Sequence, residues 1–111
     1  MKKIITIIAT LFIGVSAFAQ FSDDYTHFSI GKFQFAADQD MEEILENGGG
    51  LYRYTGFKDD VVPFYERTFC NPERLSEVAE ENGVVFTYVD IVKESTFIVS
   101  IYIRVFKLDK E

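Results

Sequence analysis

The sequence predicts an α+β domain of two layers, in which an antiparallel sheet of four or five strands carries two short helices on one face. Residues 84–92 and 96–108 are rich in β-branched and aromatic side chains and are joined by a short polar loop, which is typical of a β-hairpin. Residues 71–83 carry the start and stop signals of a helix. The second hairpin strand has one mixed face and one apolar face, as expected for a sheet covered on one side. Its apolar face comprises Phe97, Val99, Ile101, Ile103 and Val105.

The first 19 residues have the three parts of a secretory signal peptide. Residues 1–3 (MKK) are positively charged, residues 4–15 are almost entirely apolar, and residues 17–19 (AFA) form a small-x-small cleavage site. The alternative is an uncleaved membrane anchor, but the apolar run is shorter than the roughly 20 residues that span a bilayer. We therefore expect cleavage after Ala19, export to a periplasm or to the medium, and a single domain over residues 20–111 with no transmembrane segment.

Residues 25–35 (YTHFSIGKFQF) predict strand structure with an interruption. Phe28 and Ile30 lie on one face of a strand, but Phe33 and Phe35 fall on the opposite face if the strand continues. An additional residue or a turn is needed to bring all four side chains to one side. We therefore expect a β-bulge or a turn at Gly31.

A short helix is expected after Asp40. Asp40 and Glu43 have the spacing of a capping box, and Gly48 follows Asn47 as a stop signal. The helix is barely two turns long, so it depends on tertiary support. The residues expected to share its inner face are Met41, Ile44 and Leu45.

Residues 51–57 (LYRYTGF) predict the next strand, with Tyr52 and Tyr54 on one face and Arg53 on the other. Residues 61–69 are ambiguous because their apolar spacing fits a helix while their composition favours a strand. Pro63 is compatible with a first helical turn and with an edge strand. For this segment we favour extended structure.

The helix over residues 71–83 has the clearest boundaries in the chain. Asn71 is a good N-cap, Pro72 fits the first helical position, and Gly83 is a typical stop. The inner stripe comprises Leu75, Val78 and Ala79, whereas Glu73, Glu77, Glu80 and Glu81 form an outer face that we expect to be solvated.

The chain is acidic, with 18 Asp and Glu against 11 Lys and Arg and a net charge of −7. Loss of Lys2 and Lys3 with the signal peptide would make it two units more negative. Nucleic acid is not an expected partner, because phosphate binding depends on Lys and Arg. We interpret the acidity as a source of solubility.

No motif with its spacing identifies a catalytic centre, a cofactor site or a family. The single histidine, His27, and the single cysteine, Cys70, would have to meet in space to form a thiol dyad. They are too few for a zinc site, and the acidic residues 38–43 lack the pattern of a calcium loop. We therefore expect no catalytic residue, metal or cofactor. The alternative is a small secreted hydrolase or thiol enzyme that uses Cys70 and His27 or clustered carboxylates.

A non-catalytic binding module is the function that the sequence favours. Strand edges accept added strands, and Tyr and Arg are enriched at binding hot spots. Tyr52, Arg53 and Tyr54 combine these features, although sheet tyrosines more often pack in the core. We expect a protein, peptide or glycan partner on this strand, or a homo-oligomer formed through a sheet edge.

We predict that the mature protein begins at Gln20. Intact-mass measurement of protein recovered from the periplasm or the medium should give the mass of residues 20–111. Recovery of a membrane-bound species that retains residues 1–19 would contradict the predicted cleavage.

Overall fold

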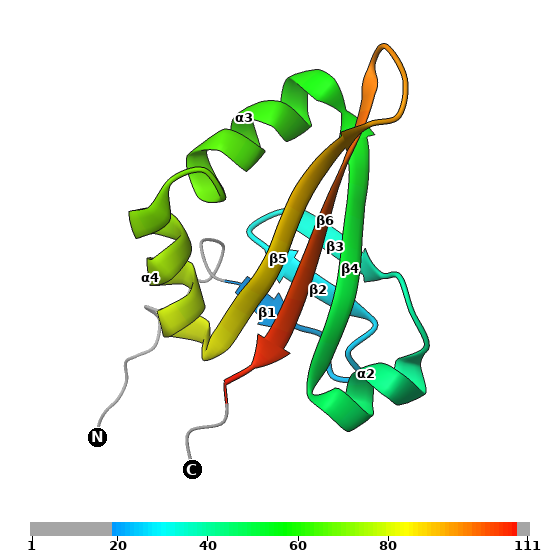
Figure 1. The fold of residues 1–111 in the computed structure, drawn as a ribbon, viewed down its shortest axis with the longest axis vertical. Helices are drawn as coiled ribbons and strands as arrows, with labels where there is room; N and C mark the ends of the chain where they lie inside the picture. Colours follow the sequence, from blue (N-terminus) through cyan, green and yellow to red (C-terminus); the bar gives the residue numbers. More distant parts are fainter. Residues whose placement is uncertain (1–18, 109–111) are drawn as a thin grey trace, which may run out of the picture.

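The computed structural model describes residues 19–108 and contains three helices and a curled, six-stranded antiparallel sheet in that part of the chain (Figure 1). The α+β class is confirmed, with one helix and at least one strand more than expected. The predicted signal peptide lies almost wholly outside the described residues. The strands are β1 (Ala19–Phe21), β2 (His27–Ile30), β3 (Phe33–Ala37), β4 (Gly49–Phe57), β5 (Val84–Lys93) and β6 (Ile98–Lys107), and the helices are α2 (Met41–Asn47), α3 (Lys58–Thr68) and α4 (Pro72–Asn82).

The sheet bends where β3 meets β4. The strand order is β1-β2-β3-β4-β6-β5, and β4 pairs with β6 along its whole length. By contrast, β3 pairs with β4 only at Ala36–Arg53 and Ala37–Tyr52. Because the pairing is so short, β1, β2 and β3 cross behind the three long strands instead of continuing their plane (Figure 1).

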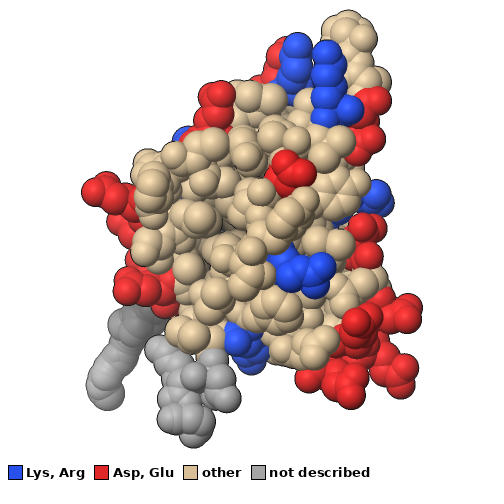
Figure 2. All heavy atoms as spheres, viewed as in Figure 1, with Lys and Arg blue, Asp and Glu red and all other residues tan. Residues whose placement is uncertain are grey.

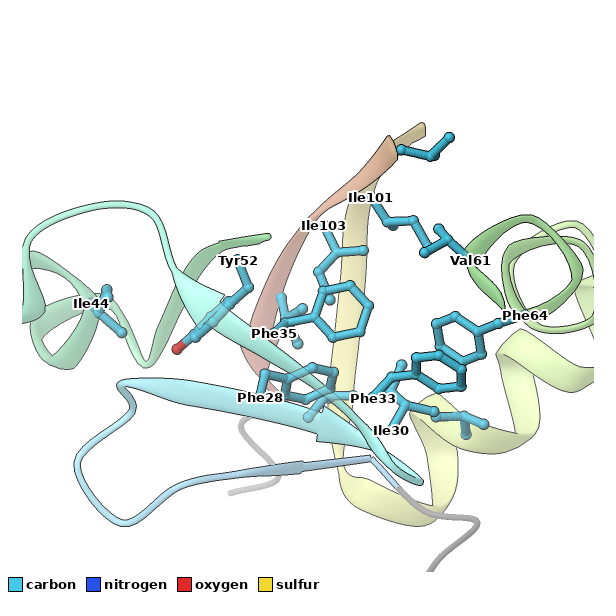
Figure 3. Packing of buried hydrophobic residues seen from close by; sticks show 14 residues of the cluster. Phe28, Ile30, Phe33, Phe35, Ile44, Tyr52, Val61, Phe64, Ile101 and Ile103 are labelled. Atoms are coloured by element: carbon cyan, nitrogen blue, oxygen red, sulfur yellow. The ribbon is translucent and has the colours of Figure 1, made fainter. Parts of the chain in front are cut away.

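The core fills the space inside this curl. Its side chains come from both halves of the sheet and from the helices, as Figure 3 shows for ten of them. Three of its aromatic side chains, Phe28, Phe35 and Tyr52, are completely buried. The other buried apolar residues are Ile30, Phe33, Ile44, Val61, Phe64, Val78, Val84, Val99, Ile101, Ile103 and Val105.

The interruption at Gly31 is a turn. Ile30 pairs with Phe33 and Phe28 pairs with Phe35, so a two-residue loop connects β2 to β3. Gly31 has a positive φ of 61°, and a type II′ hairpin turn requires a positive φ at its first loop position, which glycine adopts without strain. The chain reverses here, and all four apolar side chains consequently point into the core.

Residues 61–69 are mainly helical, and the preference for extended structure was wrong. They belong to α3, which begins directly after β4. Val61, Phe64 and Thr68 recur at helical spacing and are all buried, whereas Pro63 is exposed. Packing of this stripe against the sheet outweighs the β-forming composition and the hydrogen bond lost at proline.

The expected boundaries of α4 are confirmed. The Asn71 side chain accepts hydrogen bonds from the backbone N–H groups of Glu73 (3.2 Å) and Arg74 (3.3 Å), and Pro72 occupies the first turn. Gly83 ends the helix with φ 61°. Val78 is its fully buried residue.

The short helix α2 differs from expectation in its capping and its inner face. Gly48 ends it in the left-handed conformation, as expected, but the Asp40 side chain makes no capping hydrogen bond. Ile44 is buried, whereas Met41 and Leu45 are exposed. Ile44 is thus the one buried residue of this helix.

The hairpin of β5 and β6 is confirmed, with a register shift between Phe86 and Tyr88. Four of the five expected core residues on its second strand are buried. Phe97, the fifth, is 69% exposed because it lies in the connecting loop, before β6 begins.

Replacing Phe64 with alanine should lower the free energy of unfolding by about 3 to 5 kcal/mol, because it leaves a cavity in the aromatic core. Replacing Phe97 with alanine, the matched control, should change it by less than about 0.5 kcal/mol. Urea denaturation followed by circular dichroism measures both. Equal losses in the two variants would contradict the packing of α3.

Candidate functional site

Two of the three predicted binding residues belong to the core. The Tyr52 ring is completely buried, and its hydroxyl donates a hydrogen bond to the Tyr25 carbonyl oxygen (2.8 Å). Burial raises the pKa of Tyr52. Tyr54 is half-buried, with ring centroids 5.3 Å from Phe33 and 5.7 Å from Phe35. Neither tyrosine presents a free ring to a partner, because both point inside the curl.

The expectation of an edge strand at this position also needs correction. Strand β4 lies inside the sheet, between β3 and β6, because the later hairpin inserts β6 beside it. The edges are the three-residue β1 and the ten-residue β5. A strand-adding partner therefore finds its longest free edge at β5.

Arg53 points to the opposite side of β4 and is exposed. Its guanidinium lies 4.0 Å from the Asp38 carboxylate. The pKa of Arg53 is raised, mainly by a side-chain hydrogen bond with Tyr102 and to a smaller extent by the negative charge of Asp38. Of the three predicted residues, this one is placed where a partner can reach it.

Arg53 belongs to a three-by-three grid of outward side chains, which we call the open face. The registers of β4, β6 and β5 align these residues in three rows across the strands. The rows are Leu51, Arg104 and Tyr88; Arg53, Tyr102 and Asp90; and Thr55, Ser100 and Val92. Ser100 is itself buried between its neighbours and shares a hydrogen bond with Thr55 (2.7 Å).

The helices lie on the other side of these strands. A Cβ atom added to Gly50 would meet Ile44 of α2, and one added to Gly56 would meet Val61 of α3. Both glycines lie on the same face of β4 as Tyr52 and Tyr54, the face that points into the curl. No helix of the described residues approaches β4 from the side of the open face.

The open face is hollowed into a groove of about 530 Å³. Tyr88 is 48% exposed and Val92 is 37% exposed. The Tyr88 hydroxyl donates a hydrogen bond to Asp90 Oδ2 (3.1 Å), which raises the pKa of Tyr88 and keeps its hydroxyl protonated. The residues that line the groove are Leu51, Thr87, Tyr88, Asp90, Val92, Tyr102 and Arg104.

The charge distribution separates this surface from the rest of the molecule. In the view of Figure 2, the centre of the molecule over the long strands is mainly uncharged, while acidic side chains gather at the left and lower-right margins. Arg53 and Arg104 are the cations of the grid, and Asp90 is its single carboxylate. The open face is therefore aromatic and weakly cationic on an acidic protein.

The sequence contained a signal for this surface. Residues of even number in β6 alternate between apolar and polar types, as expected for a face that is partly wet. Tyr102 and Arg104 lie on it, but the pattern alone does not reveal which residues of β4 and β5 stand beside them. That alignment follows from the strand order.

The structure does not bring together the two residues proposed for a thiol dyad. His27 Nδ1 lies 3.1 Å from Thr26 Oγ1, whereas Cys70 is exposed after α3 and interacts with Tyr65. Among residues 19–108, no group of three or more His, Cys, Asp or Glu side chains is arranged to hold a metal ion.

No protein-family model, curated protein or solved structure was found to match the chain. None of the helices in the described part of the chain is long and apolar enough to cross a membrane.

Proposed function

We propose that this chain is an exported, non-catalytic binding module that holds a segment of another protein on its open face. The observation that carries the proposal is the grid of tyrosine, arginine and aliphatic side chains that no helix of the described residues covers. Tyrosine and arginine are the residue types that dominate binding energy at protein interfaces. Export rests on the sequence of residues 1–19.

The chemistry of the groove favours a partner segment that combines apolar and acidic side chains. Tyr88, Tyr102 and Val92 offer apolar contact area, and the tyrosines lose little conformational entropy when they are covered. Arg104 is exposed and forms no ion pair with any described residue. A carboxylate on the partner would complement it through two parallel hydrogen bonds.

Strand β5 gives the same surface a second means of binding. Its outer edge carries backbone groups that pair with no other described strand. A partner in extended conformation could add to this edge while its side chains enter the groove. The bulge next to Tyr88 increases the local twist of the edge and disfavours indiscriminate pairing.

A random peptide library displayed on phage and selected against immobilised residues 20–111 tests this proposal. We expect enrichment of peptides in which Asp or Glu flanks aromatic or aliphatic residues. Binding of a selected peptide should weaken at least about tenfold in Tyr102→Ala and in Arg104→Glu, because each change removes a central contact. Lys58→Glu makes the same charge reversal in α3 and should bind normally.

The outcomes separate this proposal from its competitors. Peptides that bind all three variants equally would exclude the open face. Failure to select any peptide, with binding in a glycan array instead, would exclude a protein segment as the ligand. A concentration-dependent dimer that Arg104→Glu abolishes would identify a second copy of the chain as the occupant.

A further inference from the structure

A second cavity, of about 520 Å³, lies on the opposite side of the fold from the groove, where the β2–β3 turn meets the corner between α3 and α4. Its floor is aromatic. Phe33 and Phe64 stack with ring centroids 3.9 Å apart and an interplanar angle of 16°, and Ile30 lies beside them (Figure 3). Phe33 and Phe64 are only 5% and 3% exposed, so a small apolar area of the floor is open to a ligand.

Three cations stand around this floor. Lys32, Arg67 and Arg74 line the cavity, which has no Asp or Glu in its lining. They are three of only 11 Lys and Arg residues in a chain with 18 Asp and Glu. In a chain with more acidic than basic residues, a cavity lined by three cations and no carboxylate is unexpected. The three cations give the cavity a local positive potential.

Two of these cations are not neutralised by carboxylates of the described residues. Lys32 Nζ lies 5.5 Å from the centre of the Phe33 ring, and the Arg67 guanidinium carbon lies 5.8 Å from the centre of the Phe64 ring. Neither forms an ion pair within residues 19–108. Arg74 bonds to Glu77 (3.1 Å). The aromatic floor thus positions Lys32 and Arg67 without cancelling their charge.

Thr68 supplies an independent observation. It lines the same cavity and is only 4% exposed, and its hydroxyl has no hydrogen-bond partner among the described residues. Buried polar groups without a partner are rare in folded proteins, because each costs about 1 to 3 kcal/mol. An unsatisfied donor beside positive side chains is an arrangement suited to an oxyanion.

We propose that this cavity binds a small organic anion, a carboxylate or phosphate monoester joined to an apolar ring or chain. The oxyanion accepts hydrogen bonds from the Thr68 hydroxyl and from Arg67, with Lys32 adding charge. The apolar body packs against the small exposed area of Phe33 and Phe64 and against the aliphatic stems of Lys32 and Arg67. Hydrogen bonds to a charged oxyanion are stronger than those between neutral groups. The proposal is independent of the open face.

Titration with phenyl phosphate, followed by two-dimensional amide NMR of residues 20–111, tests the site. We expect saturable shifts confined to residues 30–33 and 64–74, and weaker binding at higher salt because the attraction is ionic. Inorganic phosphate, which lacks the ring, and phenol, which lacks the charge, should each bind at least about tenfold more weakly than phenyl phosphate.

Thr68→Val is the decisive variant, because it keeps the shape and removes only the hydroxyl. We expect an unchanged or higher melting temperature, since an unsatisfied polar group has been removed, together with an affinity for phenyl phosphate about tenfold lower. Arg67→Gln should also weaken binding at least about tenfold. Lys58→Gln, at an exposed lysine that lines neither this cavity nor the groove of the open face, is the control and should bind like the unmodified protein.

Four results would overturn the proposal. The first is the absence of saturable phenyl phosphate binding in the unmodified protein, and the second is the same affinity for phenyl phosphate in the unmodified, Thr68→Val and Arg67→Gln proteins. The third and fourth are that phenol or inorganic phosphate binds the unmodified protein as tightly as phenyl phosphate does. A lower melting temperature in Thr68→Val would also contradict it, because it would show that the hydroxyl is already satisfied within the fold.

Discussion

The short pairing between β3 and β4 is the constraint on which the rest of the structure depends. Two residue pairs join these strands, whereas β4 and β6 pair along nine residues. The first three strands are therefore free to turn across the other three, and the aromatic side chains of both halves meet inside. Phe28 and Tyr52, from different halves, have ring centroids 6.0 Å apart. A sheet that continued flat would leave these rings without cover.

The same curl determines where the two candidate sites lie. Helix α3 begins at the residue after β4 and crosses the inner side, where Phe64 reaches Phe33 of the other half. This contact brings Arg67 and Thr68 to the β2–β3 turn and creates the cavity. Because the helices of the described residues gather on the inner side, the outer side of β4, β6 and β5 is left open. The cavity is thus formed by the packing of α3 against the β2–β3 turn, whereas the open face is the side of the sheet on which no described helix packs.

Local signals in the sequence predicted the elements whose boundaries depend on local chemistry. Asn71, Pro72 and Gly83 defined α4, and alternating apolar residues defined the hairpin, because caps and strand parity act within a few residues. Helix α3 was missed because its stability comes from contacts of Val61 and Phe64 with strands distant in sequence. The alternation placed Tyr52 and Tyr54 together correctly, but which face the helices cover is a tertiary property. Lys32 and Thr68 line the same cavity although they are 36 positions apart in the sequence, and a local periodic pattern cannot predict that proximity.

Amide hydrogen exchange along β4 tests the curl most directly. The Leu51 N–H donates to Gln39 Oε1, so odd-numbered residues of this strand face β3 and even-numbered residues face β6. Because the β3 pairing ends at Arg53, the amides of Thr55 and Phe57 should exchange rapidly, while those of Tyr54 and Gly56 should be protected by β6. Equal protection of all four amides would show that β3 continues along β4 in a flat sheet, and would contradict this account.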